Sequence, residues 1–593
     1  MKSIEIPSKL LNKQISCCYH NALFVLFSFL VLLTATYSQG TEESPFGFCP
    51  AVVNIDGYLK GYADAQNIGV TWTRPTIYAF WAVVQRDLKD TTLDFKSYDN
   101  TFGNVPVGMH IMGNISAAPA MGNFTDYLSP GSYFPTDSVQ YIRFVKKLID
   151  RYNGDGINDM PGLITPIKYW QVGNEPNTRK TDFAGLQRIT FTAAKEVDTS
   201  VSILLGGVPG FPGDYIKYFD ETYEPMLTEL DGGYFDILDF HWYGTAYGDY
   251  RLKDSKTGKD VLEHIQSSLK SHGYAENLPI WISEMGAYSG SPGNLLALNF
   301  LPQTERQQAF DYLKRHVYPL ARGVKKIFPG YGIMEGFKQE DGYFDHTGLI
   351  YDGKQSGDLG LGVKKLGYYA YKLMTEKLKG SDWDSIETII DGVNNVYCYG
   401  FKKKSGKIVR VLWWDYFQDL SYTEGDTALV TLSVPDMDSV LITSAVPDAE
   451  NGSELVDKDY PDFFLKETKP VTGNTVDIVL GIDPVFIENG SPFSVPVTRN
   501  SQGLSLSMVL EQNYPNPFNQ KTLIGFNLKS DDRISLEVFD ITGKMITALI
   551  NNQLYSAGHY EVKWETMYLP SGIYYYRLSS KTFSETRKAR LFR

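Results

Sequence analysis

Short apolar runs alternate with longer amphipathic stretches between about residues 44 and 380 of the chain. Strands that are buried on both faces of a parallel sheet read as such continuous runs, and the helices that cover the sheet show a single apolar face. The alternation therefore predicts a parallel α/β fold with eight strands. The expected strands are Phe46–Cys49, Val70–Arg74, Pro106–His110, Ile167–Val172, Ser202–Gly206, Phe235–Phe240, Pro279–Ser283 and Lys326–Phe328.

The stretches between these runs carry helix signals. After Thr136 the apolar residues fall on one helical face, and Thr304–Gln307 reads as a capping box that opens another helix. Eight strands, each followed by a helix or a loop, fit a (β/α)8 TIM barrel with insertions over residues 44–380. An open doubly wound sheet is the structural alternative, but no glycine-rich nucleotide fingerprint follows the first strand.

The pattern changes to a β-type alternation after the barrel region. Residues 385–490 are expected to form a small β-sandwich. Residues 491–507 are rich in Gly, Pro, Ser and Asn and are interpreted as a linker. A last β-rich block, residues 508–593, is expected to form a C-terminal immunoglobulin-like β-sandwich.

The N-terminal 38 residues have the features of a signal peptide. Three lysines precede an apolar run that reaches Leu33, and Thr36 and Ser38 supply the small residues of a cleavage site. The apolar run is short for a membrane span, so no transmembrane segment is expected in the mature protein. An uncleaved N-terminal anchor is the alternative interpretation.

The composition narrows the range of partners and chemistries. A net charge of −13 argues against nucleic acid or anionic lipid as a partner. The 14% of aromatic residues fits sugar binding and β-rich packing equally well. There is no CxxC, HExxH or glycine-rich phosphate loop and no spaced cluster of His and Asp, so neither a metal nor a cofactor is expected. Beyond the signal peptide only Cys49 and Cys398 remain, and two buried free thiols are favoured over a disulfide.

Two of the predicted strands end in a glutamate. Glu175 follows the fourth strand and Glu284 follows the seventh. The carboxyl ends of all strands in a TIM barrel meet at one rim, so the two side chains are expected to face each other there. A carboxylate pair is what glycoside hydrolysis requires. The aromatic residues in the strand before Glu175 favour a protonated Glu175 as the general acid, with Glu284 as the ionised nucleophile. An exposed loop carboxylate is the alternative for each.

Asn174-Glu175-Pro176 on strand four, together with Ser283-Glu284 on strand seven, resembles clan A of the glycoside hydrolases. The layout over about residues 44–490 is most similar to family 39-like enzymes. The resemblance implies retaining hydrolysis of β-glycosidic bonds in a polysaccharide or oligosaccharide by double displacement. Glu175 would be the acid/base and Glu284 the nucleophile.

Further positions match the clan and imply substrate-binding roles. Arg74 ends strand two, where the clan keeps an arginine beside the nucleophile, and Asn174 would bind the sugar 2-hydroxyl. His241 and Tyr243 end strand six in the clan's His-x-Tyr pattern. Strand eight lacks the clan's tryptophan, and Tyr331 or Phe337 is the candidate replacement. The alternatives are a surface salt bridge for Arg74 and a backbone-bonded core histidine for His241.

The C-terminal block resembles the sorting domain of type IX secretion substrates. Its motifs are Gln512–Asn519, Val538–Gly543 and Ser571–Leu578, followed by the basic residues Arg587, Lys588 and Arg590. The resemblance implies the type IX secretion machinery as a partner and a protein that is secreted or anchored at the cell surface. An ordinary immunoglobulin-like sugar-binding module is the alternative.

Two other functions remain open for the whole chain. A non-catalytic cell-surface carbohydrate-binding or adhesion protein could use the same barrel, although binding alone does not require a carboxylate pair. An inverting hydrolase would hold its carboxyl groups about 6.5–9.5 Å apart, against about 5–5.5 Å in a retaining enzyme. The separation of the two carboxyl groups therefore discriminates between the two mechanisms.

Overall fold

The structure is a computed structural model in which most of the chain after residue 43 is described. The expected signal peptide and linker lie outside the described residues. The described ranges are 44–51, 60–75, 78–117, 126–128, 132–176, 182–210, 213–243, 249–293, 300–337, 340–355, 357–415, 426–435, 437–490, 509–519, 521–556, 558–566 and 569–592.

Eight parallel strands form a ring, with each strand paired to its neighbour in chain order. Isolated parallel bridges from Phe46 to Ile327 and from Cys49 to Gly330 join the first strand to the last. The ring consists of β1 (Gly47–Phe48), β2 (Trp72–Thr73), β4 (His110–Ser116), β5 (Tyr169–Val172), β6 (Ser202–Val208), β7 (Ile237–Trp242), β8 (Ile280–Met285) and β9 (Val324–Pro329). A short strand, β3 (Ala79–Phe80), pairs with β4 off this ring.

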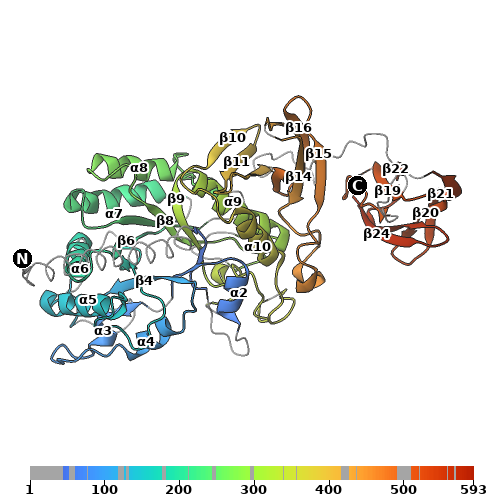
Figure 1. The fold of residues 1–593 in the computed structure, drawn as a ribbon. Helices are drawn as coiled ribbons and strands as arrows, with labels where there is room; N and C mark the ends of the chain where they lie inside the picture. Colours follow the sequence, from blue (N-terminus) through green and yellow to red (C-terminus); the bar gives the residue numbers. More distant parts are fainter. Residues whose placement is uncertain are drawn as a thin grey trace, which may run out of the picture. The chain divides into compact units, whose positions relative to one another are not determined.

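Helices cover the outside of the strands, as Figure 1 shows for α5 to α8. They are α2 (Gly61–Asn67), α3 (Trp81–Val84), α4 (Lys96–Gly103), α5 (Ser138–Tyr152), α6 (Phe183–Val197), α7 (Tyr215–Leu230), α8 (Val261–Ser271), α9 (Glu305–Ala321) and α10 (Leu366–Leu378). The predicted capping box is present at the start of α9, where Thr304 and Gln307 bond each other's backbone N–H groups. The predicted (β/α)8 barrel is therefore confirmed.

The third strand was predicted in the wrong place. Pro106–His110 was expected to be the strand, but the strand begins at His110 and runs to Ser116. The N–H of Met109 donates to the carbonyl of Pro106, and Gly108 has a φ of +85°. This left-handed glycine makes a turn before the strand. The true strand was overlooked because Gly113 and Asn114 interrupt its apolar pattern.

The interior of the ring is filled in layers. The apolar layer consists of Cys49, Trp72, Met112, Leu204, Ile237, Trp281 and Phe328. Side chains alternate between the faces of a strand, so the next inward position lies two residues further along. Two residues after Trp72, Met112, Ile237 and Trp281 come Arg74, Asn114, Asp239 and Ser283, all of them buried. The carboxyl ends of these strands therefore carry a polar layer above an apolar floor.

An antiparallel sheet of six strands follows the barrel in the chain. Its order is β10 (Glu387–Val393), β11 (Val396–Lys402), β12 (Ile408–Trp414), β17 (Val485–Asn489), β14 (Ser439–Ser444) and β15 (Lys466–Pro470). Tyr397 and Trp413 of this sheet make edge contacts with Tyr250 beside α9, at centroid distances of 5.9 Å each. The sheet thus shares an aromatic core with the barrel. The strands β13 (Ala428–Ser433) and β16 (Thr475–Leu480) form a separate antiparallel pair.

The C-terminal block has two antiparallel sheets that share one core. One sheet contains β18 (Val509–Leu510), β19 (Lys521–Leu528) and β22 (Gly558–Glu565). The other contains β21 (Met545–Tyr555), β20 (Asp532–Asp540), β23 (Gly572–Ser579) and β24 (Ser584–Leu591). Phe526 and Trp564 from the first sheet belong to the same buried cluster as Leu536 and Tyr576 from the second. Two sheets packed on one apolar core make a β-sandwich.

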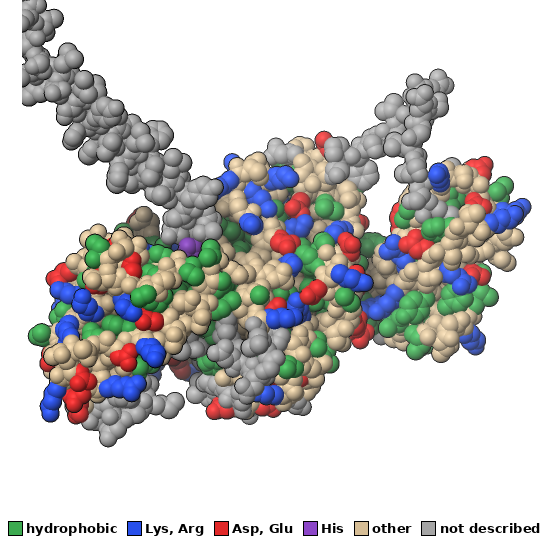
Figure 2. All heavy atoms as spheres, turned by 60° about the horizontal axis from the view of Figure 1, so that its bottom comes forward, with side chains coloured by type: hydrophobic (Ala, Val, Ile, Leu, Met, Phe, Trp, Pro, Cys, Tyr) green, Lys and Arg blue, Asp and Glu red, His purple; other side chains and the backbone are tan. Residues whose placement is uncertain are grey.

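The state of the two cysteines and the distribution of charged side chains can be seen directly. Cys49 and Cys398 are both buried free thiols, as the sequence favoured. On the face drawn in Figure 2, acidic and basic side chains of the described residues are interspersed, with hydrophobic side chains between them. Within the described part of the chain, no helix is long and apolar enough to cross a membrane.

Candidate active site

The seven residues singled out from the sequence come together at the carboxyl ends of the barrel strands. Direct hydrogen bonds and the ion pair between His241 and Glu284 link these residues into one network, which consists of Arg74, Asn174, Glu175, His241, Tyr243, Glu284 and Tyr331. They come from five different strands or the loops that follow them. A barrel achieves this convergence because all its strands end at one rim.

Glu284 lies at the centre of this network and is almost fully buried. The Arg74 guanidinium donates to its Oε1 at 2.5 Å, and the Tyr331 hydroxyl donates to its Oε2 at 2.6 Å. The Tyr243 hydroxyl also donates to Oε2. Burial by itself would raise the pKa of this carboxyl, but the charges of His241 and Arg74 and the tyrosine hydroxyls lower it to about 2. Glu284 is therefore an ionised carboxylate at neutral pH.

Glu175 lies opposite Glu284, just after the end of β5. Its φ is +45°, in the left-handed region that non-glycine residues rarely adopt. Such a backbone costs about 1–3 kcal/mol and is kept where the surrounding structure requires it. The side chain remains 37% exposed and accepts a hydrogen bond from Nδ1 of His241 at 2.6 Å. Glu175 thus borders solvent, whereas Glu284 is enclosed.

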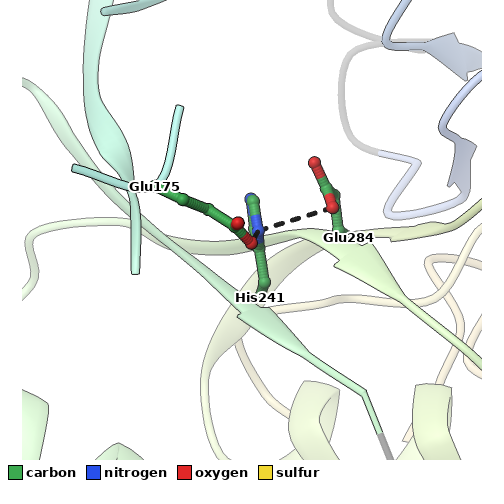
Figure 3. A group of neighbouring side chains, drawn as sticks. All are labelled: Glu175, His241 and Glu284. Atoms are coloured by element: carbon green, nitrogen blue, oxygen red, sulfur yellow. Dashed lines mark hydrogen bonds and ion pairs between the residues drawn. The ribbon is translucent and has the colours of Figure 1, made fainter. Parts of the chain in front are cut away.

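His241 lies between the two glutamates, as Figure 3 shows. Its Nδ1 is 2.6 Å from Oε1 of Glu175 and 3.5 Å from Oε2 of Glu284. Burial would lower the pKa of this imidazole, but Glu284, Asp239 and Glu175 together raise it to about 10. His241 is therefore an imidazolium at neutral pH. It is not the backbone-bonded core histidine of the alternative interpretation.

The two carboxyl groups are close together. An oxygen of Glu175, an oxygen of Glu284 and a ring nitrogen of His241 all lie within 4.8 Å of one another. This spacing could in principle suit a metal ion. An imidazolium cannot ligate a metal, however, and Arg74 already occupies Oε1 of Glu284. The constellation is better suited to moving protons and stabilising a cationic centre.

Arg74 is buried within the site and is not a surface ion pair. Its Nη2 donates to Oδ1 of Asn174 at 2.7 Å and to Oε1 of Gln171 at 2.8 Å. Its Nη1 also reaches Sγ of Cys49 at 3.1 Å. Since Arg74 takes the oxygen of Asn174, the amide nitrogen of Asn174 is the group that can donate to a substrate hydroxyl.

Tyr331 lies just after β9, at the place where the resemblance to clan A led us to expect a tryptophan. Its ring lies 4.6 Å from that of Phe337 and 4.7 Å from that of Phe344, between centroids. It stacks on Tyr243 at 6.3 Å with an interplanar angle of 7°. Tyr331, Phe337 and Phe344 are all partly exposed. They form an aromatic surface beside the nucleophile candidate, of the kind that stacks on sugar rings.

Four buried polar residues of the site were not identified from the sequence. Gln171 accepts from Asn114 at 2.6 Å and donates to Asp239, and Ser283 donates its hydroxyl to Asp239 at 2.5 Å. Asp239 lies 3.6 Å from Nε2 of His241. The sequence did contain a signal for them, because a polar residue inside an otherwise apolar buried strand requires a hydrogen-bonding partner.

The comparisons with known proteins concern two separate parts of the chain. Residues 512–590 match the family model described as a secretion system C-terminal sorting domain. The match confirms the resemblance found in the C-terminal motifs. A sorting domain of the type IX system marks proteins that are secreted or attached to the cell surface, and this chain carries one. A search of curated proteins found no significant match.

The fold is similar to that of a family 39 glycoside hydrolase from the gut symbiont Bacteroides cellulosilyticus WH2. The TM-score is 0.53 at 16% identity, covering 76% of this chain and 82% of that one. A glucosidase from Croceicoccus marinus gives a TM-score of 0.45 at 14% identity, covering 76% of this chain and 98% of that one. The GH51 arabinofuranosidase from Xanthomonas axonopodis pv. citri gives a TM-score of 0.45 at 14% identity, covering 74% of this chain and 92% of that one.

Proposed function

We propose that this chain, which combines the barrel fold of clan A glycoside hydrolases with a C-terminal sorting domain, is a retaining β-glycoside hydrolase acting outside the cell. Glu284 is the nucleophile and Glu175 the acid/base. The observation that carries the proposal is the carboxylate pair, whose oxygens approach within 4.8 Å across the barrel rim. That separation suits a retaining enzyme and is too short for the water molecule that an inverting enzyme places between its carboxylates.

In the first step an oxygen of Glu284 attacks the anomeric carbon of the sugar. The glycosidic C–O bond breaks as Glu175, in its acid form, gives its proton to the leaving oxygen. Arg74, Tyr243 and Tyr331 hold the Glu284 carboxylate ionised and oriented before the attack. The product of this step is a glycosyl ester on Glu284 and a free alcohol.

In the second step Glu175 acts as a base. Its carboxylate takes a proton from water, the water oxygen attacks the anomeric carbon, and the ester bond to Glu284 breaks. His241 donates to Glu175 and lies beside Glu284, so its positive charge stabilises whichever glutamate is ionised. Two displacements at one carbon restore the original anomeric configuration.

The substrate is a polysaccharide or oligosaccharide, bound across the rim of the barrel. Asn174 offers its amide nitrogen to the sugar 2-hydroxyl, where a hydrogen bond strengthens in the transition state. Tyr331, Phe337 and Phe344 provide the aromatic surface for a pyranose face. The sorting domain delivers the barrel to the place where such polymers occur.

Substituting the two glutamates tests the role of each. Glu175→Gln and Glu284→Gln should each lower kcat on an activated aryl β-glycoside by at least about 10³-fold without changing the circular dichroism spectrum. Added azide should restore activity to Glu284→Ala and give a glycosyl azide of inverted configuration. With Glu175→Ala, azide should give a product of retained configuration.

The wild-type product completes the test. Proton NMR during early turnover should show the anomer that keeps the configuration of the substrate. An inverted first product would exclude the double-displacement mechanism. If the wild-type protein binds polysaccharides but hydrolyses none of a broad panel, it is a carbohydrate-binding protein instead.

A further inference from the structure

A second group of carboxylates lies outside the proposed catalytic network, in the segment between β9 and α10. The N–H of Glu335 donates to the backbone carbonyl of Ile350 at 2.9 Å, and the N–H of Gly336 donates to the backbone carbonyl of Asp345 at 3.1 Å. These bonds fold the segment back on itself. Inside it, oxygens of Glu335, Asp352 and Asp358 lie within 4.8 Å of one another.

Two of these carboxylates are buried, and each has an oxygen that no donor of the described residues satisfies. Glu335 has no exposed surface and Asp352 is 3% exposed. Oε2 of Glu335 and Oδ2 of Asp352 have no hydrogen-bond partner among the residues that the structure describes. A buried polar atom without a partner costs about 1–3 kcal/mol, so it indicates an absent ligand.

The backbone orients the two aspartates of the group. The N–H of Lys354 donates to Oδ1 of Asp352 at 3.0 Å and to Oδ2 of Asp358 at 3.1 Å. The N–H of Gln355 also donates to Oδ2 of Asp358, at 3.2 Å. Each aspartate is therefore held through one oxygen, which leaves the second oxygen for a ligand.

Gly336 makes room for the buried carboxylate of Asp352. Its φ is +80°, and a Cβ at this position would lie 1.9 Å from Oδ2 of Asp352. Any other residue would clash with this oxygen and strain the backbone. The close approach of main chain and carboxylate is therefore built into the segment.

The charges of the group do not balance. Lys365 forms an ion pair with Glu335 and donates to Oγ of Ser289 at 2.8 Å, so among the described residues one buried lysine faces three carboxylates. Three carboxylates this close repel one another, and a divalent cation between them would offset the repulsion.

We propose that Glu335, Asp352 and Asp358 bind a hard divalent cation, with Ca²⁺ as the physiological ion. Three carboxylates, one lysine and one divalent ion together have no net charge. Oxygen-only ligands suit Ca²⁺, and extracellular modules bind it with Kd values of about 10⁻⁴–10⁻³ M. The site does not depend on the proposed hydrolase activity, because its ligands make no contact with the two catalytic glutamates among the described interactions.

Binding and stability measurements on the full mature chain test the proposal without an activity assay. After treatment with EDTA and removal of the chelator, titration with CaCl2 should show one site by isothermal calorimetry. The thermal midpoint should rise by about 2–5 °C at 10 mM CaCl2. Tb³⁺ should bind with sensitised luminescence that Ca²⁺ displaces. No calorimetric binding and no shift of the midpoint with Ca²⁺, Mg²⁺ or Mn²⁺ would overturn the proposal.

Variants locate the ion. Asp358→Asn, at a half-exposed position, should abolish the Ca²⁺-dependent shift of the thermal midpoint. If this variant folds poorly, Asp352→Asn is tested in its place and should have the same effect. The matched control is Asp220→Asn, since Asp220, Glu224 and His264 have a similar spacing on the surface. It should keep the full shift. Loss of the shift in the control and its retention in Asp358→Asn would assign the ion to the surface group and contradict the proposal.

Discussion

The ionisation of Glu284 depends on two cations that touch it, His241 and Arg74. Arg74 donates to Oε1 at 2.5 Å, and both groups are buried. Removing a buried cation should raise the pKa of the carboxylate, because an opposite charge at this range lowers it by about 1–3 units. In Arg74→Met the acid limb of the kcat/KM profile should therefore move to higher pH by about one unit or more, with lower activity at every pH.

Arg74→Lys is the matched control for this prediction. It keeps the positive charge and loses the fork that also holds Asn174 and Gln171. Its acid limb should move less than that of Arg74→Met. Superimposable pH profiles for Arg74→Met and the wild type would place Arg74 outside the catalytic network.

His241 should make the stability of the barrel depend on pH in the alkaline range. Its pKa is about 10 in the folded protein, against 6.5 for an unperturbed histidine. The folded state therefore holds one more proton than the unfolded state between these values, so stability falls as pH rises through the window. The slope is at most about 1.4 kcal/mol per pH unit. Thermal midpoints measured from pH 6.5 to 10 should show this decline in the wild type and a shallower one in His241→Gln.

His110 provides a control for the histidine prediction. Burial lowers its pKa to about 4, with a contribution from Lys326, so it is neutral throughout the alkaline window. His110→Gln should keep the wild-type slope even if its midpoint is lower throughout. Equal slopes in wild type and His241→Gln would contradict the imidazolium assignment.

Among the elements, α9 has the best-defined start. The Thr304 side chain accepts the N–H of Gln307, while the Gln307 side chain accepts the N–H of Thr304 at 2.8 Å. Replacing such a cap by alanine costs about 0.5–2 kcal/mol. Thr304→Ala should therefore lower the urea midpoint of the barrel measurably. Thr304→Ser keeps the capping oxygen and should stay close to the wild type, and an equal loss in both variants would show that the methyl group matters instead.

The pairing of β7 with β8 contains an irregularity that positions two residues of the site. A register shift between Phe240 and His241 brings His241 opposite Glu284 in the β7–β8 pairing. Without this shift the regular alternation of faces would turn one of the two side chains away. The alternation along each strand alone does not reveal the irregularity.

For the whole molecule, we propose that the chain after about residue 508 is required for delivery and dispensable for catalysis. The buried cluster of the C-terminal sandwich draws all its residues from positions 510–591. A domain with its own core can be removed without opening another core. A variant that ends at Gly490 should therefore keep its specific activity on a soluble aryl glycoside within about twofold, and in the native host it should accumulate in the periplasm.

Two outcomes would revise this division. Loss of activity on the soluble substrate would give the C-terminal block a structural role in the barrel. Loss of binding to insoluble polysaccharide alone, with normal export, would favour a sugar-binding module. The domain boundaries at 380, 490 and 508 remain proposals until such truncations are measured.

The sequence by itself determined the order of the elements and, apart from the third strand, their positions along the barrel. Buried parallel strands and amphipathic helices have distinct local periods, and the barrel places every strand end at one rim. Glu175 and Glu284 could therefore be paired before any contact was known. The sorting motifs were equally readable because they lie in one continuous segment, residues 512–590.

Only the tertiary structure decided which distant side chains meet and in what environment. Arg74 and Glu284 are 210 positions apart, and the pKa of Glu284 follows from its burial, from the charges of His241 and Arg74 and from two tyrosine hydroxyls. Glu335, Asp352 and Asp358 match no ligand spacing in the sequence, because a folded loop and Gly336 bring them together. Charge and burial act through space, so a pattern read along the chain cannot contain them.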